Sequence, residues 1–147
     1  MSQNYFNLFS DCGDHTSGSG NMMIVDGADI LNQNIWCQTI PISINTDYYF
    51  SLWATMVGGT SPPFLFFTAN GNSIGDTTSI PLDNCLWTEI TTIWNSGAET
   101  AVEFCILNNN TSPFGNDFAI DDVFVSTVCK STDEIGISIL ETNAVSS

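Results

Sequence analysis

The feature that most constrains this chain is a pair of adjacent acids inside a strand-like run at residues 115–125 (Gly-Asn-Asp-Phe-Ala-Ile-Asp-Asp-Val-Phe-Val). Apolar residues flank Asp121 and Asp122 on both sides, as in a β-strand. An unpaired carboxylate costs several kcal/mol or more to bury. Lys130 and His15 are the only basic side chains in the sequence, so we expect no salt-bridge partner. A metal ion is the remaining counter-charge.

A second acidic stretch lies near the N-terminus, at residues 14–21 (Asp-His-Thr-Ser-Gly-Ser-Gly-Asn). It is rich in the hard oxygen ligands that Ca²⁺ prefers. We therefore expect a sandwich whose first and last strands are joined by one cation. The simpler alternative is that Asp14 caps a turn and Asp122 points to solvent.

The remaining sequence predicts an all-β fold. The chain is 43% hydrophobic with 11 glycines, and no long stretch before the tail has helical periodicity. Some eight or nine strand-like segments alternate with turn signals at the spacing of about 8–12 residues that is typical of sandwiches. We expect about eight strands in two antiparallel sheets, forming one domain over residues 1–129. Residues 130–147 are predicted to be a linker or an extra edge strand.

The charge of the chain excludes several classes of partner. The formal net charge of −15 repels phosphate backbones and anionic lipids, so we expect neither nucleic acid binding nor membrane insertion. No stretch is long enough for a membrane span. The first residues lack the pattern of a signal peptide, and we expect the chain to be a segment of a longer secreted protein.

Five cysteines indicate disulfides rather than a zinc site, because no CxxC spacing occurs. Two disulfides and one free thiol allow about fifteen arrangements, and the sequence does not choose between them. Cys12 and Cys129 flank the two acidic stretches, so they are candidates to bridge if the terminal strands are neighbours. The other candidates are Cys85 and Cys105.

Aromatic side chains suggest a binding surface. By alternation, Tyr49 and Trp53 lie on the strand face opposite the core set, and Phe64 and Phe66 do so in the next strand. Exposed rings that gather together mark interaction surfaces. Sugars stack on such rings, with Glu89 and Glu103 as candidates for hydrogen bonds. The alternative is that a loop or a sheet covers these rings as a second small core. Trp87 is expected in the main core.

Two motifs resemble MAM domains, which are jelly-roll sandwiches of the galactose-binding-like type: residues 14–26 resemble their opening and residues 117–123 their closing motif. Residues 20–28, 35–39, 45–53, 85–88 and 94–97 resemble jelly-roll modules of large proteins that bacteria export by type IX secretion. The resemblance covers about residues 10–129. It implies a structural Ca²⁺, with Na⁺ as the alternative. The implied ligands are Asp14, Thr16, Asn21, Asp121, Asp122 and loop carbonyls.

The sequence contains few side chains that are suited to catalysis. One His, one Lys and no Arg leave few groups to stabilise a developing anion. In a regular strand Asp121 and Asp122 point to opposite faces, so they do not form a glycosidase pair.

We therefore predict a non-catalytic, secreted or cell-surface module that binds carbohydrate. The alternative is an adhesin or filament module. It would contact another surface protein, or itself, through the aromatic face or through a sheet edge left open by a missing first strand.

Overall fold

The described part of the protein is built from strands alone. The computed structural model describes residues 9–112 and 114–128. These residues form eight strands: β1 (Met23–Asp26), β2 (Gln33–Pro41), β3 (Asp47–Gly58), β4 (Phe64–Ala69), β5 (Asn72–Ser79), β6 (Thr88–Asn95), β7 (Ala101–Asn108) and β8 (Asp117–Thr127). They contain no helix with the length and apolarity that a membrane crossing requires.

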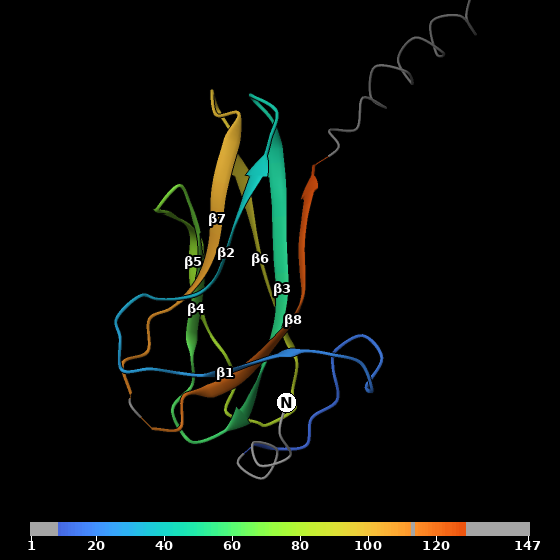
Figure 1. The fold of residues 1–147 in the computed structure, drawn as a ribbon, viewed down its shortest axis with the longest axis vertical. Helices are drawn as coiled ribbons and strands as arrows, with labels where there is room; N and C mark the ends of the chain where they lie inside the picture. The colour runs from blue at the N-terminus through green and yellow to red at the C-terminus, as the bar shows by residue number, and fades with distance from the viewer. Residues whose placement is uncertain (1–8, 113, 129–147) are drawn as a thin grey trace, which may run out of the picture.

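The strands form two four-stranded sheets, and the predicted antiparallel β-sandwich of eight strands is confirmed (Figure 1). Sheet A has the order β1-β8-β3-β6, and sheet B has the order β2-β7-β4-β5. Strand β1 pairs with β8, with Met23 opposite Ile120, so the first and last strands are neighbours as expected. The chain passes from sheet A to sheet B between β3 and β4.

Strand β3 supplies the centre of the core by regular alternation. Phe50, Leu52 and Ala54 are fully buried, as the sequence predicts. They share one cluster with Phe67 of β4 and Phe104 of β7. The Phe50 and Phe104 rings stack with their centroids 4.1 Å apart. Burial of each such side chain stabilises the fold by about 1.5–3 kcal/mol.

The hairpin between β4 and β5 turns at Asn70-Gly71. Ala69 lies opposite Asn72, so the turn has two central residues. Both have positive φ, 49° at Asn70 and 78° at Gly71. This is the conformation that Asn-Gly favours in tight hairpins, because neither residue is strained there.

A β-bulge interrupts β8 at Asp122. The register between β3 and β8 shifts between Ser51 and Trp53, and the φ of Asp122 is 49°. Before the bulge Ile120 faces the core, and after it Val125 does. The extra residue changes the alternation, so Asp121 and Asp122 both face outward. The prediction that these two acids point to opposite faces is therefore wrong, because the strand is not regular.

The disulfides differ from the expected Cys12–Cys129 pair. Cys12 bonds to Cys85, and Cys37 bonds to Cys105, which lies directly opposite on the neighbouring strand. Cys12 lies beside the β-bridge of Met56 and Asn84 rather than near the end of β8, which explains its partner. Cys129 and the predicted linker or edge strand at 130–147 lie outside the described residues.

Candidate functional site

A loop from Cys12 to Gly20 covers one end of the outer face of sheet A. The Cys12–Cys85 disulfide ties it to the segment before β6. The indole Nε1 of Trp87 donates to the carbonyl of Gly13 at 3.3 Å. Cys12 packs with Val57 and Ala119 in a second small core, and Trp87 packs against this cluster. The expectation that Trp87 lies in the main core is therefore wrong.

The loop is organised around the carboxylate of Asp14, which is 8% exposed. It accepts hydrogen bonds from the Ser17 amide at 2.9 Å, from the Ser17 hydroxyl at 3.0 Å and from the Gly20 amide. The Ser17 and Gly20 amides hold the pKa of Asp14 below its usual value. The alternative interpretation, that Asp14 organises a turn, describes this geometry well.

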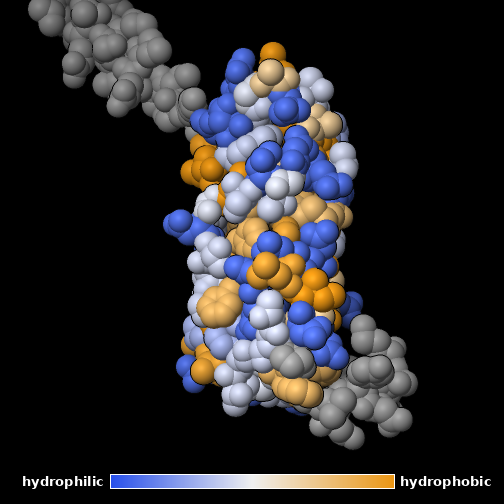
Figure 2. Space-filling view, turned by 90° about the vertical axis from the view of Figure 1, so that its left-hand side faces the viewer, coloured by the Kyte–Doolittle hydropathy of each residue, from blue (hydrophilic) through white to orange (hydrophobic). Residues whose placement is uncertain are grey.

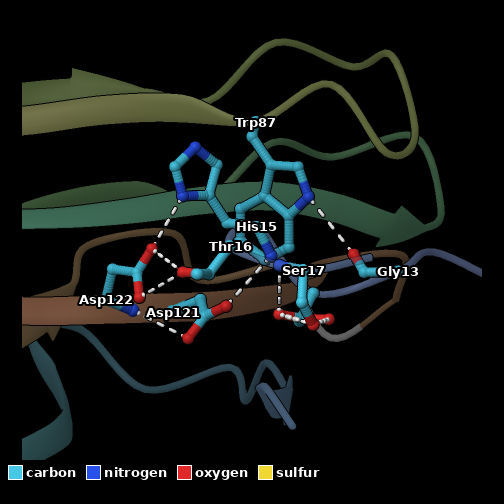
Figure 3. A network of polar contacts seen from close by, with 8 residues as sticks. Gly13, His15, Thr16, Ser17, Trp87, Asp121 and Asp122 are labelled. Carbon is cyan, nitrogen blue, oxygen red and sulfur yellow. Dashed lines mark hydrogen bonds and ion pairs between the residues drawn. The ribbon is translucent and has the colours of Figure 1, made fainter. Parts of the chain in front are cut away.

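The same loop makes hydrogen bonds to Asp121 and Asp122 of β8 (Figure 3). The backbone amide of His15 donates to Asp121 at 3.0 Å. The His15 Nδ1 lies 2.7 Å from Asp122, and the Thr16 hydroxyl donates to Asp122 at 2.6 Å. His15 and then Thr16 lower the pKa of Asp122. The expectation that these acids lack a partner is therefore wrong, because the bulge presents both to the loop.

The predicted metal ligands meet only in part. Asp14, Thr16, Asp121 and Asp122 lie in or beside this network, whereas Asn21 is exposed and lies before β1. Within residues 9–112 and 114–128, no three His, Cys, Asp or Glu side chains are arranged to hold a metal ion. As they lie, the carboxylates accept hydrogen bonds and do not form a calcium shell. The calcium ion, or the alternative sodium ion, stays a prediction.

Trp53 lies under the loop rather than in the open. The ring of His15 stacks on it with centroids 3.8 Å apart and planes tilted by 14°. Trp87 meets the same imidazole edge-on at 5.7 Å. Trp53 is half-buried as a result. The alternative in which a loop covers the rings holds for this residue.

Beyond the loop, the outer face of sheet A is open. We call this part the platform and define it by Tyr49, Glu89, Thr91, Ile93 and Phe124, which lie on three adjacent strands. Ile93 is 62% exposed and Phe124 is 54% exposed. Alternation in β6 could have identified Ile93 as outward-facing, because the buried Ile90 has the opposite parity. The bulge concealed the orientation of Phe124.

A hydrogen bond joins two of the predicted ligand residues on the platform. The hydroxyl of Tyr49 donates to Glu89 Oε1 at 3.3 Å. Partial burial, and then the charge of Glu89, raise the pKa of Tyr49. Glu89 is exposed and pairs in register with Trp53. Tyr49, Trp53 and Glu89 therefore lie close together on the outer face of sheet A.

The other three predicted ligand residues lie on the opposite side of the sandwich. Phe64, Phe66 and Glu103 belong to sheet B, so the six residues do not share one face. Phe66 is only 9% exposed and packs with Cys105 and Leu107. Phe64 is 38% exposed. In Figure 2, hydrophobic residues on the face shown are interspersed with hydrophilic ones. The prediction that the aromatic residues share one face is therefore wrong, because the chain passes from sheet A to sheet B between β3 and β4.

Comparisons with known proteins support the fold. No protein-family model and no curated protein matches the chain. Among solved structures, the sugar-binding C-terminal domain of EclA has a TM-score of 0.60 at 15% identity, over 76% of this chain and 87% of that one.

Two further structures are carbohydrate-binding modules. The CBM22-1 xylan-binding domain of Xyn10C from Paenibacillus barcinonensis has a TM-score of 0.55 at 11% identity, over 84% of this chain and 81% of that one. A family 35 module from an environmental isolate has a TM-score of 0.50 at 15% identity, over 83% and 90%. At such identities these likenesses show the jelly-roll fold alone. The resemblance to MAM domains and type IX modules stays a prediction.

Proposed function

We propose that this protein is a non-catalytic carbohydrate-binding module that binds a neutral glycan on the platform. The observation that carries the proposal is the hydrogen-bonded Tyr49–Glu89 pair on an open sheet face beside the exposed ring of Phe124. The sugar-binding, xylan-binding and carbohydrate-binding neighbours of the fold support it.

The platform offers the two kinds of contact that a sugar requires. Tyr49 and Phe124 present ring surfaces, and Ile93 extends the apolar area between strands. A pyranose can place its C–H face on such rings. Glu89 then accepts hydrogen bonds at its edge, and the Thr91 hydroxyl accepts or donates them. Because the Tyr49–Glu89 contact is long and exposed, a sugar hydroxyl can replace it at little cost.

Charge favours neutral sugars over acidic ones. The chain has a formal net charge of −15, and Glu89 lies on the platform itself. A polysaccharide with carboxylate or sulfate groups would be repelled from this surface. A neutral glycan escapes that repulsion, and its hydroxyls can donate to Glu89.

The acids of this face do not support glycoside hydrolysis. Hydrolysis requires two carboxyl groups on either side of the scissile bond. Glu89 is the one carboxylate of the platform, while Asp121 and Asp122 accept hydrogen bonds from the loop. Binding without catalysis is therefore the function that we propose.

The proposed location is outside the cell. The described residues contain two disulfides, which form and persist in oxidising compartments. An extracellular module that carries glycan-binding rings is consistent with that setting.

A glycan array followed by titration tests the proposal. We expect the protein to bind at least one neutral oligosaccharide, and Tyr49→Ala and Phe124→Ala each to weaken binding by about 2 kcal/mol, roughly 30-fold. The matched control is Phe64→Ala, which removes a partly exposed ring from the opposite face. Absence of binding to every neutral glycan, or an equal loss in the control, would refute the platform.

A further inference from the structure

Strand β8 has a free edge along more than half of its length. On one side β3 pairs with it from Asp117 to Thr127. On the other side β1 pairs only from Asp117 to Ile120. In Figure 1, β1 crosses the lower part of β8, and the upper part continues beyond it. Among the described residues, no strand pairs with this side of β8 at positions 121–127.

An apolar slit opens beside this free edge. It has a volume of about 230 Å³ and lies between the two sheets. Val123 and Val125 of β8 form one wall. The lining from sheet B is Trp36, Gln38, Ile40 and Phe104. A free edge beside apolar side chains is a template for another strand.

The second wall has the same character. Strand β2 pairs only with β7 and ends sheet B on this side. Its side chains Trp36 and Ile40 are half-buried and reach the core cluster. The slit therefore leads directly to Phe104, which is 1% exposed. An aliphatic side chain placed there would complete the edge of the core.

The sequence after β8 has the pattern of such a strand. The chain continues beyond Thr127 to Ser147, and residues 135–140 read Ile-Gly-Ile-Ser-Ile-Leu. In the sequence Ile135, Ile137 and Ile139 alternate with Gly136, Ser138 and Leu140, and this apolar period of two is typical of a half-buried strand. The seven intervening residues, 128–134, contain Lys, Ser, Thr, Asp and Glu, which suit a solvent-exposed connection.

We propose that residues 135–140 dock as a ninth strand on the free edge of β8, antiparallel to it. Opposed residues in an antiparallel pair point to the same face. With Ile137 opposite Val125 and Ile139 opposite Val123, both isoleucines enter the slit. The inference is independent of the glycan proposal, because the slit lies between the sheets rather than on the platform.

The occupant is the same chain rather than a second copy. Seven residues are enough to connect two antiparallel strands, and a short connection gives a high effective concentration. A second copy would bring another net charge of −15 to the same edge. The docked strand would also cover an edge that otherwise favours aggregation.

Native-state hydrogen exchange on the whole chain tests the proposal. We expect the edge-facing amides of residues 121–127 to be protected at all protein concentrations. Ile137→Asp should speed their exchange at least about tenfold, since it places a charge in the slit. The matched control Ser138→Asp changes the opposite face of the segment and should leave exchange unchanged. Amides between β3 and β6 report that the sandwich remains folded.

A truncated chain that ends at Lys130 provides a second test with the same measurement, because it lacks the whole segment 135–140. It should show the same fast exchange as Ile137→Asp. Three results would overturn the proposal. They are fast exchange of these amides in the unaltered protein, equal rates in all variants, and protection that rises with protein concentration, which would assign the edge to a second copy.

Discussion

The two outer faces of the sandwich each carry a disulfide, but the disulfides have different roles. On sheet A, Cys12–Cys85 fastens a loop that lies across the strands and makes hydrogen bonds to Asp121 and Asp122 of β8. On sheet B, Cys37–Cys105 links two strands that are already paired, beside Phe66 and Leu107. One face is completed by a loop outside the sheet, and the other by side chains of its own strands.

This difference explains which rings remain open. The loop of sheet A covers Trp53 and stops short of Phe124, so a binding surface remains at one end of that face. On sheet B, Phe66 is covered by its own neighbours, and only Phe64 is partly exposed. The face that carries the added loop is therefore the one on which two accessible rings, Tyr49 and Phe124, lie beside the exposed Glu89.

The largest expected effect comes from removing the two disulfides separately, as Cys12→Ser with Cys85→Ser and as Cys37→Ser with Cys105→Ser. Their sequence separations of 73 and 68 are similar, so chain entropy predicts a loss of about 4 kcal/mol for each in urea denaturation. Limited proteolysis should distinguish them, because only the first pair releases residues 13–20. Cleavage in that loop after loss of the sheet B pair would contradict the comparison.

Truncating one ring on each face should have unequal consequences. Phe66→Ala should cost about 3 kcal/mol of unfolding free energy, since this ring is nearly buried. Trp53→Ala should cost about 1–2 kcal/mol, because part of its surface is already exposed and the His15 stack contributes about 0.5–1.5 kcal/mol. A double-mutant cycle with His15→Ala measures that stack. Zero coupling would show that the loop is not held by it.

The predicted calcium ion would act on sheet A alone. If it joins the loop to β8, calcium at 100 times its Kd should stabilise the protein by about 2.7 kcal/mol, and EDTA should lower the melting temperature accordingly. Asp121→Asn should abolish this sensitivity, whereas Asp76→Asn on β5 of sheet B should retain it. An identical melting curve with and without EDTA, together with no metal in elemental analysis, would refute the predicted calcium ion.

The smallest effects concern two acids of β8 with opposite pKa shifts. His15, followed by Thr16, lowers the pKa of Asp122 from 3.8, so its contribution to stability is present above that pH and is lost as the pH falls through the folded-state value. Burial, and then the carboxylate of Asp26 opposite, raise the pKa of Asp117. Its contribution is present below pH 3.8 and is lost as the pH rises through the raised value.

At pH 7 in EDTA, Asp122→Asn should therefore destabilise the protein and Asp117→Asn should stabilise it, each by less than about 1 kcal/mol because both acids are largely solvated. Urea denaturation at pH 7 and pH 3 measures both changes. If both substitutions change the free energy of unfolding in the same direction, then it is wrong that the loop stabilises the charged form of Asp122 while Asp26 destabilises the charged form of Asp117.

The sequence predicts the local parts of this structure well. Alternation alone identifies the buried set of β3, and Asn70-Gly71 fixes a hairpin, because both depend on neighbouring residues. The disulfide partner of Cys12 and the distribution of the aromatic residues between the two faces depend on which sheet each strand joins. The alternation of apolar and polar residues along one strand does not reveal that. The bulge at Asp122 could not be predicted either, because a single residue with positive φ does not change the pattern of apolar residues in the sequence.

The two disulfides also overlap in the sequence, and this has a mechanical consequence. Cys37 lies between Cys12 and Cys85, and Cys85 lies between Cys37 and Cys105. If the chain is pulled at its two ends until every strand has separated, tension passes from Cys12 across the sulfur bridge to Cys85. It then follows the backbone only from position 85 to position 105. Residues 13–84 lie off this path, so most of the domain cannot lengthen into a tether. Under force such a module would extend only a little while its disulfides are intact. Reduction of the disulfides would allow the rest of the chain to extend.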